Sequence, residues 1–256
     1  MLMEWPFLFV GFFAGALGTL IGAGGGIILI PVMLLLYPQM PPEKLTAISL
    51  GMICANSVSG TISYARMGRV VYSAGLIFAA ATIPGSLAGA WLVQYLPKQL
   101  FAAIFSAVLI MVAIYILIRP GRHDRPDAKI NISSQGLKYG TVLSFGVGFL
   151  ATLLGIGGGI VHVPVMVYLV GLPVHAATAT SHFVLAIMSA TATAVHIYNG
   201  SFEGSWLILF YLAAGAVIGA QVGALLSKKV KGLLILRILA VALGLTGIRI
   251  LLIALK

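Results

Sequence analysis

The chain has 256 residues, of which 61% are hydrophobic and 8% are charged, and its mean hydropathy is +1.12. Soluble proteins carry about 25% charged residues, so this composition excludes a soluble globular domain and is typical of a polytopic membrane protein. The net charge of +10 comes from 15 Lys and Arg against 5 acidic residues. Those bases gather in a few loops, which indicates a cytoplasmic membrane face rather than a nucleic-acid partner.

Apolar runs follow one another in an order that repeats. The first half holds a run broken by glycines at 5–37 and three further spans, predicted at 46–64, 71–95 and 100–118. The second half holds a broken run at 139–171 and spans predicted at 179–198, 206–226 and 233–255. A membrane-spanning helix needs about 20 apolar residues. We therefore expect an all-α polytopic membrane protein with two membrane domains, 1–118 and 139–256, joined by a basic cytoplasmic linker at 119–138.

Two clusters of glycine mark the repeat. The first glycine cluster, Gly22–Gly26 (GAGGG), recurs 133 residues later as the second glycine cluster, Gly155–Gly159 (GIGGG). The sequence Pro-Val-Met that starts at Pro31 recurs at Pro164 with the same offset. The chain is therefore interpreted as a duplication, with one cluster inside the broken run of each half.

The loop charges predict opposite orientations for the two halves. The turn at 65–70 contains Arg66 and Arg69, whereas its counterpart at 199–205 has no Lys or Arg. In the next loop Lys98 stands alone in the first half, whereas three lysines cluster at 228–231 in the second. Basic loops face the cytoplasm, so matched loops lie on opposite faces and the halves are predicted to be inverted repeats. The alternative is a parallel duplication in which each broken run crosses the membrane once.

An inverted arrangement requires each broken run to return to the face on which it starts. A run of 33 residues would be roughly 50 Å long as one helix, which is too long for one crossing and suits two helices of about 15 residues. We predict a glycine-broken helical hairpin at each cluster, followed by three transmembrane helices in each half. Both termini then lie on the outer side of the cell inner membrane.

The glycine clusters themselves are the predicted binding site. Non-helical backbone persists in hydrocarbon only where protein or a water-filled cavity satisfies it. Glycine reaches positive φ and exposes its amide, and the helix that follows each cluster points its N-terminal amides at it. Six glycines are expected to bind a small anion near the bilayer midplane: Gly24, Gly25, Gly26, Gly157, Gly158 and Gly159. The alternative is that the glycines only permit a tight bend or close helix packing.

The polar residues of the spans are consistent with an anion. All five acids fall in loops or near the terminus, which argues against a cation site or a carboxylate proton relay, and we expect no metal and no cofactor. Four side chains are expected to add hydrogen-bond donors: Asn56, Ser57, His182 and Ser189. The alternative role for each is an interhelical hydrogen bond. His162 and His182 break the repeat, because their matched positions hold Leu29 and Leu50.

The two glycine-cluster modules, each with its proline and each followed by a Thr- and Ser-rich span, resemble the sulfite exporter TauE/SafE family. This family is also called the 4-toluene sulfonate uptake permease group. The resemblance covers nearly the whole chain and implies a multi-pass membrane transporter of sulfite, sulfonates or related anions. It does not select the substrate, and it carries over no site residue beyond the glycine clusters.

The sequence thus predicts a secondary transporter whose partners are the lipid bilayer and a small anion such as sulfite or an organosulfonate. Export is the expected direction, because an inside-negative potential favours the exit of an anion that moves alone. Rocking of one repeat against the other would expose the site alternately to the two sides. The alternatives are a passive anion channel, a permease for a different small anion and a scaffold subunit. An intramembrane enzyme is disfavoured, because the sequence has no HExxH, no GxSxG and no paired aspartates in its spans.

Overall fold

The computed structural model describes residues 4–118, 133–230 and 232–254, and within these ranges the chain forms helices and no strand. The helices of the first half are α1 (Pro6–Ile21), α2 (Gly26–Leu36), α3 (Pro42–Arg66), α4 (Tyr72–Leu92), the 3-10 turn η1 (Val93–Tyr95) and α5 (Lys98–Ile118). Those of the second half are α6 (Ser134–Leu154), α7 (Gly159–Val165), the π-helical turn η2 (Met166–Val170), α8 (Val174–Tyr198), α9 (Trp206–Leu226) and α10 (Gly232–Ala254). In the described ranges, six helices are long and apolar enough to cross a membrane: α3, α4, α5, α6, α8 and α9. The expected all-α polytopic membrane protein is confirmed.

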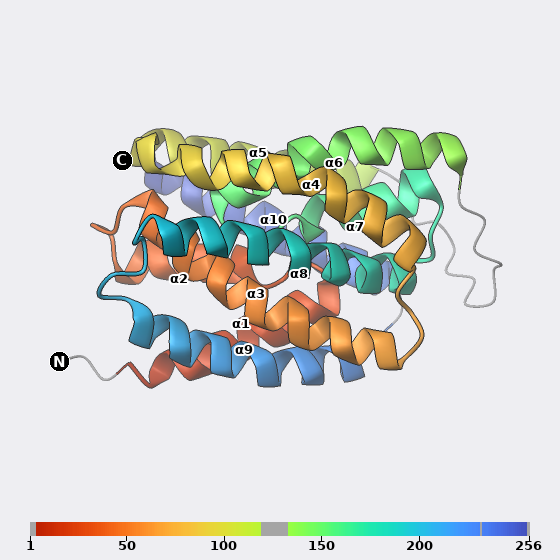
Figure 1. Ribbon diagram of the computed structural model, residues 1–256, viewed down its shortest axis with the longest axis horizontal. Helices are drawn as coiled ribbons and strands as arrows, with labels where there is room; N and C mark the ends of the chain where they lie inside the picture. Colours follow the sequence, from red (N-terminus) through yellow and green to blue (C-terminus); the bar gives the residue numbers. More distant parts are fainter. Residues whose placement is uncertain (1–3, 119–132, 231, 255–256) are drawn as a thin grey trace.

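Each broken run forms two helices that turn back at its glycine cluster. The start of α1 lies beside the end of α2, where the rings of Phe7 and Tyr37 stack with centroids 6.1 Å apart. The start of α6 lies beside the end of η2, where the amide of Ser133 donates to the carbonyl of Val170 at 3.2 Å. Figure 1 shows the chain reversing its direction at both places. Each half therefore contains a helical hairpin broken at glycine.

Three helices begin earlier than the apolar runs suggest. Residues 134–138 of the predicted linker belong to α6, whose first turn is capped by the Ser133 hydroxyl, which accepts from the amide of Gly136 at 3.0 Å. Residues 119–132 of that linker lie outside the described residues. Helices α3 and α8 each start directly after a proline, Pro41 and Pro173. Their first turns contain polar residues, so hydropathy alone places the start of each helix too late.

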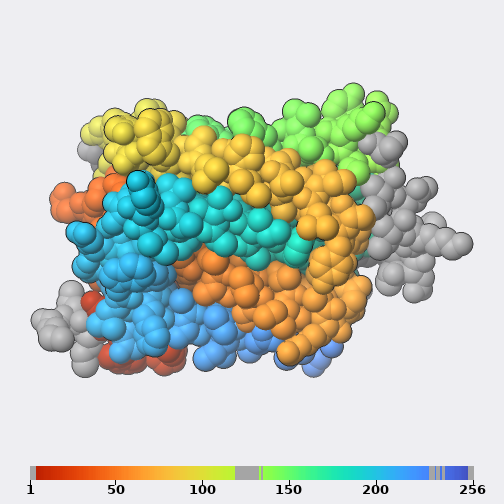
Figure 2. All heavy atoms as spheres, in the orientation of Figure 1, coloured from red at the N-terminus to blue at the C-terminus, as the bar shows by residue number. Residues whose placement is uncertain are grey.

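Four long helices lie side by side in the order α4, α8, α3, α9, and together they cover one face of the molecule (Figures 1 and 2). Helix α1 packs along α9, α6 along α4, and α5 along α10. The glycine clusters lie in the interior, because every residue of 19–27 and of 151–160 is buried. The protein therefore surrounds both clusters with helices from both halves.

Glycines make two of these helix pairs possible. A Cβ added to Gly219 of α9 would overlap the carbonyl oxygen of Phe12 in α1, and one added to Gly85 of α4 would overlap that of Phe145 in α6. In each pair, residues further along one helix contact residues further along the other, so the two helices run parallel. Small residues spaced four apart allow helix backbones to approach this closely.

Candidate functional site

The two glycine clusters meet inside the protein, although they are 133 residues apart in the chain. A Cβ added at Gly26 would lie 2.5 Å from the carbonyl oxygen of Gly155. A Cβ added at Gly159 would overlap the carbonyl oxygen of Gly22. Backbone of one cluster therefore packs directly on backbone of the other, and only residues without a side chain fit in this contact.

The turns also use backbone conformations that favour glycine. Positive φ angles occur at Gly22 (+85°), Gly24 (+79°), Gly25 (+87°), Gly155 (+66°) and Gly157 (+71°). Residues other than glycine rarely adopt this left-handed backbone conformation. Gly158 differs, because its φ is −68°. The first cluster thus has two adjacent left-handed glycines within its GGG sequence, whereas the second has one.

Each cluster contributes backbone amides that cap the C-terminal end of the helix that precedes it. The amides of Ala23 and Gly24 donate to the carbonyl of Gly18 at 2.8 and 3.2 Å, and the amide of Ile156 donates to that of Ala151 at 3.1 Å. Helix α2 has 11 residues and begins at Gly26. The amides of Ile28 and Leu29 donate to the carbonyl of Gly25 at 3.1 Å, whereas those of Gly26 and Ile27 have no carbonyl within their own helix to bind. These amides and the positive end of the helix dipole are directed at the place where the clusters meet.

Two serines bind the clusters across the two halves. The hydroxyl of Ser49 in α3 donates to the carbonyl of Gly155 at 2.5 Å, and that of Ser181 in α8 donates to the carbonyl of Gly22 at 3.0 Å. Ser49 and Ser181 are at aligned positions in the repeat, and so are Gly22 and Gly155. Each half therefore holds the first carbonyl of the other half's cluster. Neither serine is among the predicted site residues, although the alignment of TAIS with TATS in the two spans is a signal that points to them.

The predicted residues Ser57 and Ser189 face each other from α3 and α8, with hydroxyl oxygens 3.5 Å apart. Each hydroxyl also donates within its own helix, Ser57 to the carbonyl of Ile53 at 2.7 Å and Ser189 to that of Leu185 at 2.6 Å. The side chains of Ile53 and Leu185 contact Gly24. The serine pair therefore lies one helical turn away from the cluster contact and not within it.

The predicted residues Asn56 and His182 meet through Thr19 of α1. The Thr19 hydroxyl donates to Asn56 Oδ1 at 3.2 Å and lies 3.2 Å from His182 Nε2. The Tyr64 hydroxyl donates to the backbone carbonyl of Thr19 at 2.8 Å, and its ring packs edge-on against His182. In one orientation the Asn56 amide donates to the carbonyl of Gly24 at 3.4 Å, and in the other to carbonyls of α1 and α9 at 3.2 Å. We call these four fully buried side chains the Thr19 network.

The Thr19 network adds two residues, Thr19 and Tyr64, that the sequence did not identify. The position of Thr19, three residues before the first cluster, is the signal that could have found it. Tyr64 carries no comparable signal, because it lies near the far end of α3 and reaches Thr19 only in the folded protein. The network touches the first cluster and thus connects Asn56 and His182 to it.

His162 packs against the second cluster. Its Nε2 lies 3.2 Å from the hydroxyl of Ser144, and its ring stacks on Phe78 with centroids 6.3 Å apart. A Cβ added at Gly158 would lie 2.8 Å from its Nδ1. Across the described ranges, no group of three or more His, Cys, Asp or Glu side chains is placed to hold a metal ion.

These features define a class of protein: a polytopic helical membrane protein whose halves meet through glycine-broken helices in a buried, uncharged polar centre. A family model described as "Sulfite exporter TauE/SafE" matches residues 7–250. The chain belongs to this family, whose members are membrane transporters and not enzymes.

Individual relatives agree with this assignment. The "Probable membrane transporter protein YunE" of Bacillus subtilis (strain 168) is 30% identical, with 93% of each chain covered. The "Probable membrane transporter protein YfcA" of Escherichia coli (strain K12) is 29% identical over 84% of this chain and 77% of that protein. The "Probable membrane transporter protein MJ0441" of Methanocaldococcus jannaschii is 26% identical over 96% and 94% of the two chains. No solved structure matches the chain.

Proposed function

We propose that the protein is a secondary transporter that exports a small sulfur-containing anion, sulfite or an organosulfonate, across the cytoplasmic membrane. The observation that carries this proposal is the contact between two glycine clusters from opposite halves, in the buried centre of a membrane protein. The description of the matching family as sulfite exporters supports the substrate class.

The proposed anion site lies where the clusters meet. Its backbone donors are the amides that open α2, together with the glycines of both clusters: Gly24, Gly25, Gly26, Gly157, Gly158 and Gly159. The Gly24 amide is bonded to the carbonyl of Gly18 and must leave it to reach an anion. The nearest side-chain donors of the site are Asn56 and His182. Ser57 and Ser189 lie one helical turn away, and each must turn its hydroxyl from a carbonyl of its own helix before it can reach an anion. The acids of the described ranges, Glu4, Glu43 and Glu203, lie near helix starts and away from this centre. An anion therefore meets donors without a nearby carboxylate to repel it.

The packing of the helices supports the proposed inverted repeat. The first helix of each hairpin packs on the second-to-last helix of the other half, α1 on α9 and α6 on α4. Matched helices of the two halves also pack on each other, α3 on α8 and α5 on α10. A two-fold axis in the membrane plane would produce this exchange. The ends of α3 and α9 lie at one end of the molecule (Figure 1) and carry Arg66, Arg69, Lys228 and Lys229. Because basic loops favour the cytoplasm, we orient this end inward.

The closed packing of the clusters favours a carrier over a passive channel. Every residue of 19–27 and 151–160 is buried, so an anion can enter only when the clusters separate. Separation breaks the hydrogen bonds of Ser49 and Ser181, each of which contributes about 0.6 kcal/mol inside a membrane protein. This small cost is compatible with repeated opening toward alternate sides during a transport cycle.

Flux into proteoliposomes tests the proposal. Sulfite, sulfate, taurine and 4-toluenesulfonate are compared in one assay, and we expect saturable flux of sulfite or of a sulfonate. Gly25→Val and Gly158→Val should abolish that flux while membrane insertion and elution as a folded species persist. Gly146→Val is the matched control, because an added Cβ at this position in α6 meets nothing within 4 Å. Flux that rises without saturation would indicate a channel, and normal flux by both cluster variants would contradict the proposed site.

A further inference from the structure

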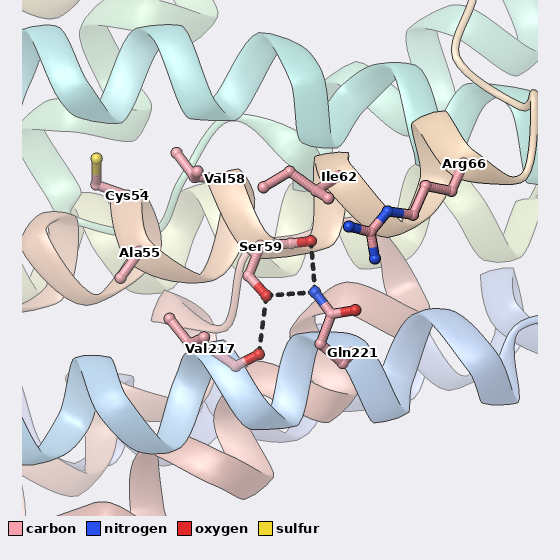
Figure 3. Close-up of a pocket in the computed structure, with 8 residues that line it drawn as sticks. All are labelled: Cys54, Ala55, Val58, Ser59, Ile62, Arg66, Val217 and Gln221. Atoms are coloured by element: carbon pink, nitrogen blue, oxygen red, sulfur yellow. Dashed lines mark hydrogen bonds between the residues drawn. The ribbon is translucent and has the colours of Figure 1, made fainter.

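A groove on the side of the protein lies between α3 and α9, away from the glycine clusters (Figure 3). Its volume is about 500 Å³, and it follows α3 from Cys54 to Arg66. The side chains of Val58 and Ile62 on α3 are each 45% exposed, and Val217 on α9 is 40% exposed. The groove is therefore open along its length to whatever surrounds the protein.

The polar groups in the groove are bonded to one another. The Gln221 amide nitrogen donates to the carbonyl of Ser59 at 2.9 Å and to its hydroxyl at 2.7 Å, while the amide oxygen accepts from Ser63. The hydroxyl of Ser59 donates to the carbonyl of Val217 at 2.8 Å (Figure 3). Since these donors are used within the protein, the groove presents mainly apolar side chains. Such a surface suits a hydrocarbon chain better than a small polar solute.

One end of the groove is strongly basic. The guanidinium of Arg66 points back over the groove (Figure 3), and Arg69 donates to the hydroxyl of Ser227 at 3.0 Å, which ties the end of α3 to the end of α9. Lys228 and Lys229 follow Ser227 and are exposed. The described acids precede or begin α1, α3 and α9 and so lie at the opposite end. No acidic residue of the described ranges therefore lies near this positive charge. The basic end of the groove is complementary to a phosphate group.

The length of the groove matches one leaflet of a membrane. Cys54 and Arg66 are 12 residues apart on one helix, a distance of about 18 Å at 1.5 Å per residue. One leaflet contributes about half of the roughly 30 Å hydrocarbon core. With Arg66 at the headgroup level, the apolar part of the groove spans the acyl layer of that leaflet.

We propose that this groove binds one anionic phospholipid, with an acyl chain along Val58, Ile62 and Val217 and the phosphate at Arg66. Basic pockets between membrane helices on the cytoplasmic side are suited to such lipids. The matched surface between α8 and α4 has Tyr198 in place of Arg66 and Leu87 in place of Gln221. It lacks the cation, so of these two matched surfaces in the described ranges only the groove between α3 and α9 combines an apolar lining with a basic end.

Native mass spectrometry of the purified protein in neutral detergent tests this site. Phosphatidylglycerol and phosphatidylcholine with identical acyl chains are titrated separately. We expect one phosphatidylglycerol to bind more tightly than phosphatidylcholine. Arg66→Ala should weaken phosphatidylglycerol binding about fivefold, as expected for one cation near a membrane surface, and Arg66→Lys should largely restore it. Val217→Trp should weaken both lipids, because the indole fills the groove.

Two variants serve as controls. Lys138→Ala removes an exposed charge on α6, and Ile218→Trp adds an indole at an exposed neighbour outside the groove; both should bind phosphatidylglycerol normally. An equal loss in Lys138→Ala and Arg66→Ala would mean diffuse charge attraction and overturn the site. Displacement of the lipid by sulfite would assign the groove to the substrate. If the protein is a dimer and Val217→Trp separates it into monomers, the groove is the interface with a second copy of the chain. Displacement by sulfite and loss of a dimer would each overturn the proposal. None of these measurements depends on flux.

Discussion

The interior beside the first glycine cluster and the interior beside the second differ in chemistry, although the clusters hold each other in the same way. Ser49 bonds the carbonyl of Gly155 just as Ser181 bonds that of Gly22. The parallel pairs α1 with α9 and α4 with α6 are likewise built on glycines that contact backbone. The shared features are thus those that pack backbone against backbone.

The polar side chains do not follow this correspondence. Thr19 binds Asn56 and His182, whereas Thr152, at the matched position in α6, is buried and its hydroxyl makes no hydrogen bond. Met188 stands at the position that matches Asn56. Packing requirements therefore act on both halves, whereas the polar side chains differ: the four-residue Thr19 network lies beside the first cluster, and the single pair of His162 and Ser144 lies beside the second. A ligand at the cluster contact would meet polar side chains mainly from the side of the first cluster.

The largest expected effect concerns the backbone of the two clusters. Gly25→Ala places a side chain at a φ of +87°, where its Cβ lies 2.6 Å from the carbonyl oxygen of Ala14. Gly68→Ala imposes a similar φ of +65° in open space and should cost about 1 kcal/mol. We expect Gly25→Ala to cost a further 1–3 kcal/mol from overpacking, measured by thermal unfolding in detergent.

Gly158→Ala sharpens this comparison of the clusters. Its φ of −68° is acceptable to alanine, and its added Cβ meets the ring of His162 rather than backbone. The loss of stability should therefore be smaller than that of Gly25→Ala. Equal losses in the two variants would show that the clusters are conformationally equivalent and that the difference in φ has no consequence.

The next effect concerns the polar network. Thr19→Val removes the hydroxyl shared by Asn56 and His182 and should lower the free energy of unfolding by about 1–3 kcal/mol, the cost of leaving buried polar groups unpaired. Thr152→Val is the matched control: it replaces a hydroxyl that makes no hydrogen bond, so it should be neutral or stabilising. Denaturant unfolding of both variants measures the difference, and a similar loss in both would refute the asymmetry.

The smallest effect concerns the paired serines. Ser49→Ala and Ser181→Ala each remove one hydrogen bond between the halves and should each cost about 0.6 kcal/mol, the average for hydrogen bonds within membrane proteins. Similar losses for the two variants in the same unfolding assay would show that the two serine contacts are equivalent. A loss several times larger for one serine would show that the two contacts are not equivalent.

Much of the architecture was predictable from the sequence, because it depends on local patterns. Runs of about 20 apolar residues specify spanning helices, and the repeated glycine clusters indicated where each broken run turns. Helices α3, α6 and α8 start at 42, 134 and 174, earlier than the apolar runs predict, because a polar residue in each first turn (Glu43, Gln135 and His175) interrupts the apolar run. Asn56 and His182 are buried, as expected for polar side chains within apolar helices, whereas their role as donors to an anion stays a prediction.

Only the tertiary structure decided which of these residues meet. The sequence of a helix gives the spacing of its residues but not its rotation against distant helices, so the contacts of Thr19 with Asn56, His182 and Tyr64 join three helices that no local pattern relates. The direct contact of Gly159 with Gly22 has the same origin. The sequence by itself determined the membrane class, the repeat and the glycine turns, whereas the packing of one half on the other decided the composition of the buried polar centre.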